Sequence, residues 1–288
     1  IMFSKHFVTY GDRSFNIQKK RIKYQANQLN FYDKIHVFSH KDISKEFKLK
    51  FKNIFNAELG GGYWIWKIYI LDQMLKRTNE NDIFLYLDAG STINIKAKKR
   101  MNEYFEILHN SDKSFLRFSI DKKEKYWTSK EVFNYFNLNI NSNYGESDQL
   151  AGGIIFVKNN DVSKNFVKEF YELLDYDEKL ITDLYNKNQI DGFVSPRHDQ
   201  SILSLLGKIY ESIIIKDETY FADNLSEQHK YPILTVRDGR YSFWQKFKFY
   251  INYFDNLKKP IFFGEKKYYF NKVSLYKRIK FKFKNSFN

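Results

Sequence analysis

Residues 82–90 read DIFLYLDAG, and this stretch decides the fold. Every side chain from Ile83 to Leu87 is aliphatic or aromatic, which is typical of a central strand that is covered on both faces. The run ends abruptly at Asp88, so the strand is expected to place a carboxylate at its carboxyl end. Ligands of open α/β sheets bind at that edge. An aspartate in an ordinary turn after a strand fits this stretch equally well.

Short apolar runs alternate with helical patterns on both sides of this strand. Strands are predicted at 6–10, 34–39, 114–120, 153–158 and 212–216, and helices at 63–77, around 101–108, after 161 and after 199. In the 63–77 helix, the apolar stripe includes Trp64, Ile68 and Leu71, and Lys67 is expected to face elsewhere. Asp161 is expected to cap the helix that follows it. The alternation predicts an α/β fold with a mainly parallel sheet and helices on both faces.

Composition narrows the class of protein. The chain has 288 residues, of which 43% are hydrophobic and 19% aromatic, enough for one large domain or a domain with an appendage. Cysteine is absent, which excludes disulfides and thiolate metal ligands. No apolar run approaches the ~20 residues of a membrane-spanning helix. Ile1 precedes Met2, which is consistent with a chain cut from a longer protein.

The positive charge is concentrated at one end. Of the net charge of +14, ten charges fall in residues 243–288, where 12 Lys and Arg face only Asp255 and Glu265. We therefore divide the chain into a folded domain, 1–242, and a basic, aromatic segment, 243–288. Basic and aromatic residues together suit an anionic membrane surface, although a solvated tail or an oligomer contact fits equally well. A nucleic-acid-binding domain spreads its basic residues over the folded body, so no nucleic-acid partner is expected.

Three further stretches carry residues suited to chemistry. Residues 59–67, LGGGYWIWK, combine glycines that allow close backbone approach with Lys67, which is suited to a phosphate. Residues 148–153, DQLAGG, offer a carboxylate and an amide that can hydrogen-bond to a ligand. Residues 197–201, RHDQS, place Asp199 at a helix start, where the helix stabilises a carboxylate by ~0.3–1 kcal/mol. Each has a plainer interpretation: a tryptophan-packed loop, a glycine turn and a helix N-cap.

Taken in order, these stretches resemble the motifs of glycosyltransferases with the GT-A fold. Residues 83–90 look most like the Leu-Asp-Ala-Asp region of family 8 sugar transferases, and 59–67 is similar to a block in bacterial capsule and lipooligosaccharide transferases. The sequence departs from the family at Gly90, which stands where the second acidic residue is found. The resemblance implies a GT-A-like, Rossmann-type sheet, a nucleoside diphosphate sugar as donor, with UDP favoured, and a glycan or lipid-linked glycan as acceptor.

The resemblance also implies roles for individual residues. Asp88 and a late histidine, His229, would bind Mn²⁺ or Mg²⁺, since hard cations prefer oxygen ligands and neutralise the leaving diphosphate. Asp199 would be the general base if the anomeric centre inverts, which is the outcome we favour; otherwise Asp199 and Gln200 would stabilise the transition state. Asp148 is the second candidate catalytic residue and would lie along the donor sugar. The candidates for donor and nucleotide binding are Thr9, Tyr10, Asp12, Lys67, Asp88, Gln149, Gly152, Gly153, Gln200 and Arg237.

The sequence thus predicts a hexosyltransferase-type enzyme of bacterial surface polysaccharide synthesis, peripheral at the inner face of the inner membrane. Two alternatives remain. Gly90 in place of an acid fits a catalytically inactive carbohydrate-binding module, and the charge and aromatic content fit a nucleic-acid-binding protein. The sequence contains no phosphate-binding P-loop, no Rossmann glycine fingerprint and no serine nucleophile elbow.

Overall fold

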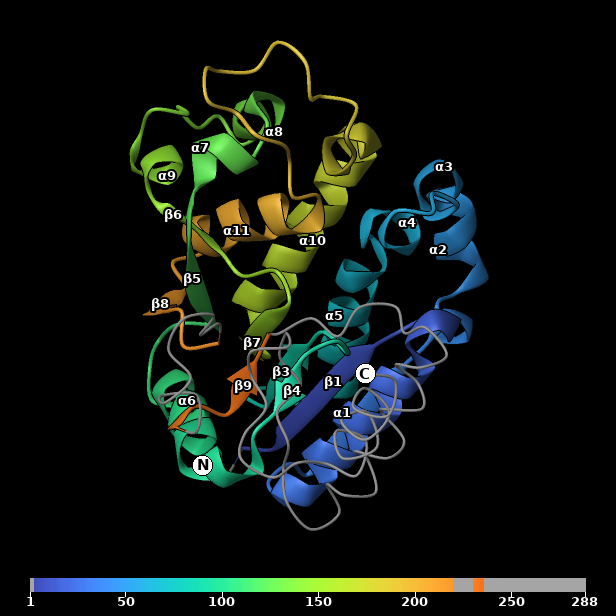
Figure 1. Cartoon of the computed structure of the whole chain (residues 1–288), viewed down its shortest axis with the longest axis vertical. Helices are drawn as coiled ribbons and strands as arrows, with labels where there is room; N and C mark the ends of the chain where they lie inside the picture. The colour runs from blue at the N-terminus through green and yellow to red at the C-terminus, as the bar shows by residue number, and fades with distance from the viewer. Residues whose placement is uncertain (1–2, 220–229, 236–288) are drawn as a thin grey trace, which may run out of the picture.

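The computed structural model describes residues 3–219 and 230–235. Within them, seven strands form one mixed sheet in the order β2-β1-β3-β7-β5-β6, with β8 paired to β5 (Figure 1). The strands are β1 (Lys5–Tyr10), β2 (Lys34–Phe38), β3 (Ile83–Leu87), β5 (Phe115–Lys123), β6 (Asp148–Leu150), β7 (Ile154–Lys158) and β8 (Ile213–Lys216).

Five of these seven strands run in one direction, so the expectation of a mainly parallel sheet is confirmed. β1 pairs in parallel with β2 and β3, and β5 pairs in parallel with β8. β7 is antiparallel to both β3 and β5, and β6 is antiparallel to β5. Because Leu87 lies opposite Ile154, the start of β7 lies beside the end of β3.

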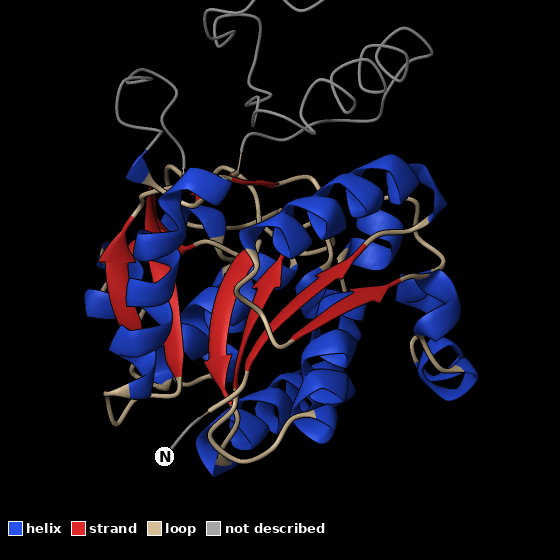
Figure 2. Cartoon of the chain, turned by 90° about the horizontal axis from the view of Figure 1, so that it is seen from below, coloured by secondary structure: helices blue, strands red, loops and turns tan. Residues whose placement is uncertain are grey.

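Helices cover both faces of the sheet, as predicted (Figure 2). Helices α1 (Asn16–Leu29) and α6 (Lys98–His109) pack on one face, and α5 (Trp66–Arg77), α10 (Asp161–Tyr176) and α11 (Asp199–Ile209) on the other. The side chains of β3 alternate between them: Phe84 and Tyr86 join the α5 side, whereas Leu85 and Leu87 join the α1 side. All five β3 residues are fully buried, which is why this strand carries no polar residue.

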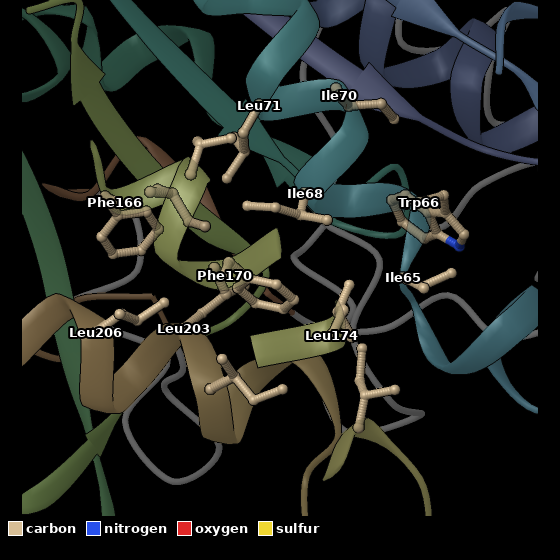
Figure 3. Close-up of a cluster of buried hydrophobic side chains, with 14 of the residues drawn as sticks. Ile65, Trp66, Ile68, Ile70, Leu71, Phe166, Phe170, Leu174, Leu203 and Leu206 are labelled. Atoms are coloured by element: carbon tan, nitrogen blue, oxygen red, sulfur yellow. The ribbon is translucent and has the colours of Figure 1, made fainter. Parts of the chain in front are cut away.

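Helices α5, α10 and α11 meet in one apolar cluster (Figure 3). Ile68 and Leu71 from α5 contact this cluster together with Phe166 and Phe170 from α10 and with Leu203 and Leu206 from α11. Full burial of each such side chain contributes about 1.5–3 kcal/mol. The cluster therefore fixes helices α5 and α11 relative to β3.

Short elements complete the described chain. They are α2 (Lys45–Lys50), α3 (Lys52–Phe55), α4 (Gly60–Tyr63), α7 (Glu124–Trp127), α8 (Lys130–Tyr135), α9 (Asn143–Glu146), four 3-10 turns (Arg13–Phe15, His40–Asp42, Ile95–Ala97 and Glu178–Ile181), and the two-residue strands β4 (Thr92–Ile93) and β9 (Ile233–Leu234). In the described residues, no helix is both long and apolar enough to cross a membrane. The segment 243–288 lies outside them.

The structure corrects two local predictions, the start of the 63–77 helix and the cap of α10, and it shows the burial of Lys67, which was not predicted. The 63–77 helix begins at Trp66, because residues 60–64 all have positive φ and cannot belong to a right-handed helix. Lys67 is buried, with 2% of its surface exposed, because it forms an ion pair inside the protein. Asn160, and not Asp161, caps α10: its side chain accepts a hydrogen bond from the Ser163 backbone.

Candidate active site

Asp88 lies at the carboxyl edge of the sheet, directly after β3. Its backbone N–H donates to Gly153 O (2.9 Å), and its Oδ1 accepts a hydrogen bond from the Tyr86 hydroxyl (2.7 Å). A Cβ added to Gly153 would lie 2.6 Å from Asp88 Oδ2, so a larger residue here would displace the Asp88 carboxylate. The Asp88 side chain remains 31% exposed. The loop before β7 therefore orients a carboxylate that solvent or a ligand can reach.

Lys67 joins the three central motifs. From the first turn of α5, its Nζ donates to Asp199 Oδ2 (2.5 Å) and to Gly152 O (2.9 Å), and lies 3.8 Å from Asp88 Oδ1. A buried ammonium is costly unless it is paired and hydrogen-bonded. Lys67 meets both conditions, and it brings the 59–67, 83–90 and 148–153 stretches together with Asp199.

Asp199 is the first residue of α11 and is 4% exposed. The helix N-cap is His198, so the interpretation of Asp199 as a simple cap is wrong. Burial raises the pKa of the Asp199 carboxyl above its usual value, and the ammonium of Lys67 opposes that rise. Burial is the larger effect, so this carboxylate holds a proton more readily than a free aspartate.

Gln200 and Gln149 form the next layer. Gln200 Nε2 donates to Gln149 Oε1 (2.8 Å), and a Cβ on Gly152 would lie 2.7 Å from Gln200 Cβ. Gln149 is fully buried, and Asp148 pairs with Lys123 (3.2 Å). The structure thus brings Gln200 and Gly152 to the site, sets Gln149 behind Gln200, and points Asp148 toward Lys123.

The turn after β1 lies against the glycine block. Asp12 Oδ1 accepts from the backbone N–H (2.8 Å) and hydroxyl (2.6 Å) of Ser14, and Asp12 Oδ2 lies 3.8 Å from a Cβ built on Gly61. The Tyr10 ring is buried and stacks on Trp66, with centroids 4.0 Å apart. Thr9 is fully buried on the α1 side of the strand. Of these three residues, Asp12 is the most exposed.

Two buried charged residues support the site and were not predicted. Arg21 from α1 donates to Gly90 O (3.0 Å) and Ser91 O (2.8 Å), which holds the turn after Asp88. Glu124 is fully buried and accepts hydrogen bonds from β6, from α11 and from the residue after α7. The donors are Gln149 Nε2 (3.0 Å), Lys208 Nζ (2.7 Å), the Ser204 hydroxyl and Thr128 Oγ1 (2.5 Å). Both lie in charged stretches that resemble solvated surface, so no local signal distinguishes them.

The described residues do not by themselves complete a divalent-cation site. Within residues 3–219 and 230–235, no three His, Asp or Glu side chains are grouped as metal ligands. Asp88 is the one expected ligand in this part of the chain, and the nearby Lys67 ammonium repels a second cation. His229 and Arg237 lie outside the described residues.

No family model matches the chain, and no curated protein matches it in sequence. Solved structures similar to it include a glycosyltransferase involved in the glycosylation of the major capsid of PBCV-1 (12% identity, 83% of this chain and 94% of that chain, TM-score 0.46). The bifunctional glycosyltransferase WbbM is similar at 11% identity over 98% of this chain and 52% of that chain, with a TM-score of 0.49. The galactosyltransferase LgtC, solved with donor and acceptor sugar analogues, is similar at 11% identity over 85% of this chain and 94% of that chain, with a TM-score of 0.42.

Proposed function

We propose that this chain is a glycosyltransferase that moves a sugar from a nucleoside diphosphate sugar to a glycan hydroxyl. The observation that supports this proposal most is that four residues from separate segments meet at one site. Lys67, Asp88, Gly152 and Asp199 come from four separate segments and meet through contacts of 2.5–3.8 Å at the carboxyl edge of the sheet. These segments are also the ones whose order along the chain resembles the GT-A motifs.

The charges of this cluster suit a diphosphate leaving group. Two carboxylates alone would repel an incoming diphosphate, and the Lys67 ammonium between them offsets that repulsion. Asp12, at the turn after β1, adjoins Gly61, where the space beside the backbone allows a ligand to approach. We assign the nucleoside to this turn and the diphosphate to the surroundings of Asp88, with UDP as the favoured nucleotide.

Asp199 is proposed as the general base of an inverting transfer. The acceptor oxygen attacks the anomeric carbon, the bond from that carbon to the diphosphate oxygen breaks, and the hydroxyl proton passes to the Asp199 carboxylate. The raised pKa of Asp199 suits it to accept this proton. Gln200 and the Gly152-Gly153 backbone then lie where they can position the donor sugar.

The finer assignments are part of the same proposal. Asp88 and His229 are the proposed ligands of Mn²⁺ or Mg²⁺, which would neutralise charge on the diphosphate; no step above depends on the metal. The acceptor is proposed to be a bacterial surface polysaccharide, of a capsule or a lipooligosaccharide. Residues 243–288 are proposed to hold the enzyme at the inner face of the inner membrane through their basic side chains.

A thermal-shift panel tests the donor site. UDP, GDP and CMP are each added with and without Mn²⁺, because a ligand at about 100 times its Kd stabilises a fold by roughly 2.7 kcal/mol. We expect one nucleotide to raise the melting temperature of the wild type and of Asp72→Ala, whose carboxylate is 20% exposed and pairs with Lys76 on α5, but not of Asp88→Ala. The absence of any nucleotide shift, or a shift that survives in Asp88→Ala, would contradict the proposal.

Sugar transfer tests the base. With the nucleotide that binds, Asp199→Asn is expected to lose about 10²–10⁴-fold in turnover of the sugar nucleotide, because an amide cannot accept the proton. Full activity in this variant would remove Asp199 from that role.

A further inference from the structure

Three aromatic side chains meet beside Asp199. The Tyr63 and Trp64 rings lie 5.1 and 5.4 Å from the His198 ring, measured between centroids. His198 directly precedes Asp199, and Lys67, which pairs with Asp199, follows Trp64 by three positions. All three rings are partly exposed, so they form a wall next to the proposed base that a ligand can contact.

The backbone that carries these rings is strained at all three positions. The φ angles of Tyr63, Trp64 and His198 are 50°, 59° and 54°, in the region that favours glycine. Such conformations cost about 1–3 kcal/mol each and are retained mainly at functional sites. Gly60 makes room for this arrangement, because a Cβ there would lie 2.4 Å from the Trp64 indole.

We propose that Tyr63, Trp64 and His198 form the platform that binds the acceptor sugar, a proposal that rests on the proposed function. The C–H face of a pyranose ring packs on aromatic rings, which offer large apolar area with few rotatable bonds. Polar groups lie beside the platform: His198 Nε2 is 3.1 Å from Asp183 Oδ1, and the Asp183 side chain is 41% exposed. Its carboxylate is placed to accept hydrogen bonds from sugar hydroxyls.

The loop that leads to His198 supports this assignment. Leu184 and Val194 are 68% and 59% exposed, although both are large apolar residues. They stand on the same irregular segment, residues 182–198, as Asp183 and His198. Apolar and polar groups together on one loop beside a reactive carboxylate match the mixed character of a pyranoside, which presents C–H faces and hydroxyl edges.

The test uses variants that remove a ring and keep the backbone. Asparagine tolerates positive φ better than most residues, so Tyr63→Asn and Trp64→Asn remove the platform with little added strain. Tyr135→Asn, in a partly exposed position on α8, is the matched control. Saturation-transfer NMR is recorded with the methyl glycosides of glucose, galactose and N-acetylglucosamine, with and without UDP.

We expect at least one glycoside to bind the wild type and the control, and its affinity to fall at least about tenfold in each platform variant, equivalent to about 1.4 kcal/mol. The thermal shift with nucleotide should stay unchanged in all variants, which excludes general unfolding. Glycoside binding that persists in both platform variants, or none to the wild type, would overturn the platform. The glycoside-binding experiment does not depend on turnover of the donor. Failure of the transferase proposal is detected in a separate assay, as the absence of sugar-nucleotide hydrolysis or transfer.

Discussion

Replacement of Lys67 by methionine should destabilise the protein in a way that depends strongly on pH. Lys67→Met leaves Asp199, 4% exposed, without a counter-ion and removes the donor to Gly152 O. Loss of one partner from a buried ion pair costs about 3–5 kcal/mol. Asp199 can limit that cost by taking up a proton. Since a free aspartate has a pKa near 3.9, protonation costs at most about 4 kcal/mol at pH 7 and about 1.5 kcal/mol at pH 5.

The sign of the pH effect follows from proton linkage. In Lys67→Met the folded state binds a proton at Asp199 more tightly than the unfolded state, so stability relative to the wild type rises as pH falls. Urea unfolding of both proteins at about pH 5 and about pH 7 measures this difference. Lys67→Met/Asp199→Leu, which removes both charges, should recover much of the loss. A Lys67→Met variant within about 0.5 kcal/mol of the wild type at pH 7 would refute the buried pair.

Three further outcomes are expected. The pKa of Asp199 is raised, so transfer activity should increase as the pH rises through a range above the pKa of an ordinary aspartate, which a pH–activity curve measures. Over the same range the contribution of Asp199 to stability should fall, which unfolding at several pH values measures. Gly153→Ala should displace Asp88 and abolish the nucleotide thermal shift, whereas Gly90→Ala should preserve it, since a Cβ on Gly90 meets nothing within 4 Å; equal behaviour of the two would contradict the site geometry. Glu124→Gln should lower the unfolding free energy by about 1–3 kcal/mol in urea titration, because a buried charged acceptor is lost, and an unchanged midpoint would count against the network.

Six of the seven strands of the main sheet were predictable because their signal is local, whereas the three-residue strand β6 was not predicted. The uninterrupted apolar run of 82–87 predicts a central strand, and β3 is central and fully buried. The order of the motifs also predicted which segments meet at the edge of the sheet. Two-residue strands such as β4 and β9 have no period to detect, and they form only through pairing over a long sequence separation.

The interior of the site was less predictable because its contacts also join residues that are far apart in the sequence. Periodicity placed Lys67 off the apolar stripe and gave no sign of its burial, since a lysine is rarely buried unless paired. Its partner, Asp199, lies 132 residues away. The helix was predicted to include Tyr63 and Trp64 because the prediction rests on the spacing of apolar residues, and that spacing carries no information about the sign of φ. Gln149 was predicted at the donor sugar, but its side chain is held behind Gln200 by a hydrogen bond to the buried carboxylate of Glu124. The lysines around Glu124 in the sequence made that residue look exposed.

The separation of Lys67 from Asp199 has a consequence for synthesis on the ribosome. At about 5–20 residues per second, the 132 positions between them take about 7–26 s to translate. During that interval the nascent chain can pair β1 with β2 and β3. The Asp199 carboxylate has not yet been synthesised, so Lys67 has no partner with which to be buried and stays hydrated. Formation of the Lys67–Asp199 ion pair is therefore a late event, and a chain stalled on the ribosome before α11 emerges would lack the carboxylate that pairs with Lys67.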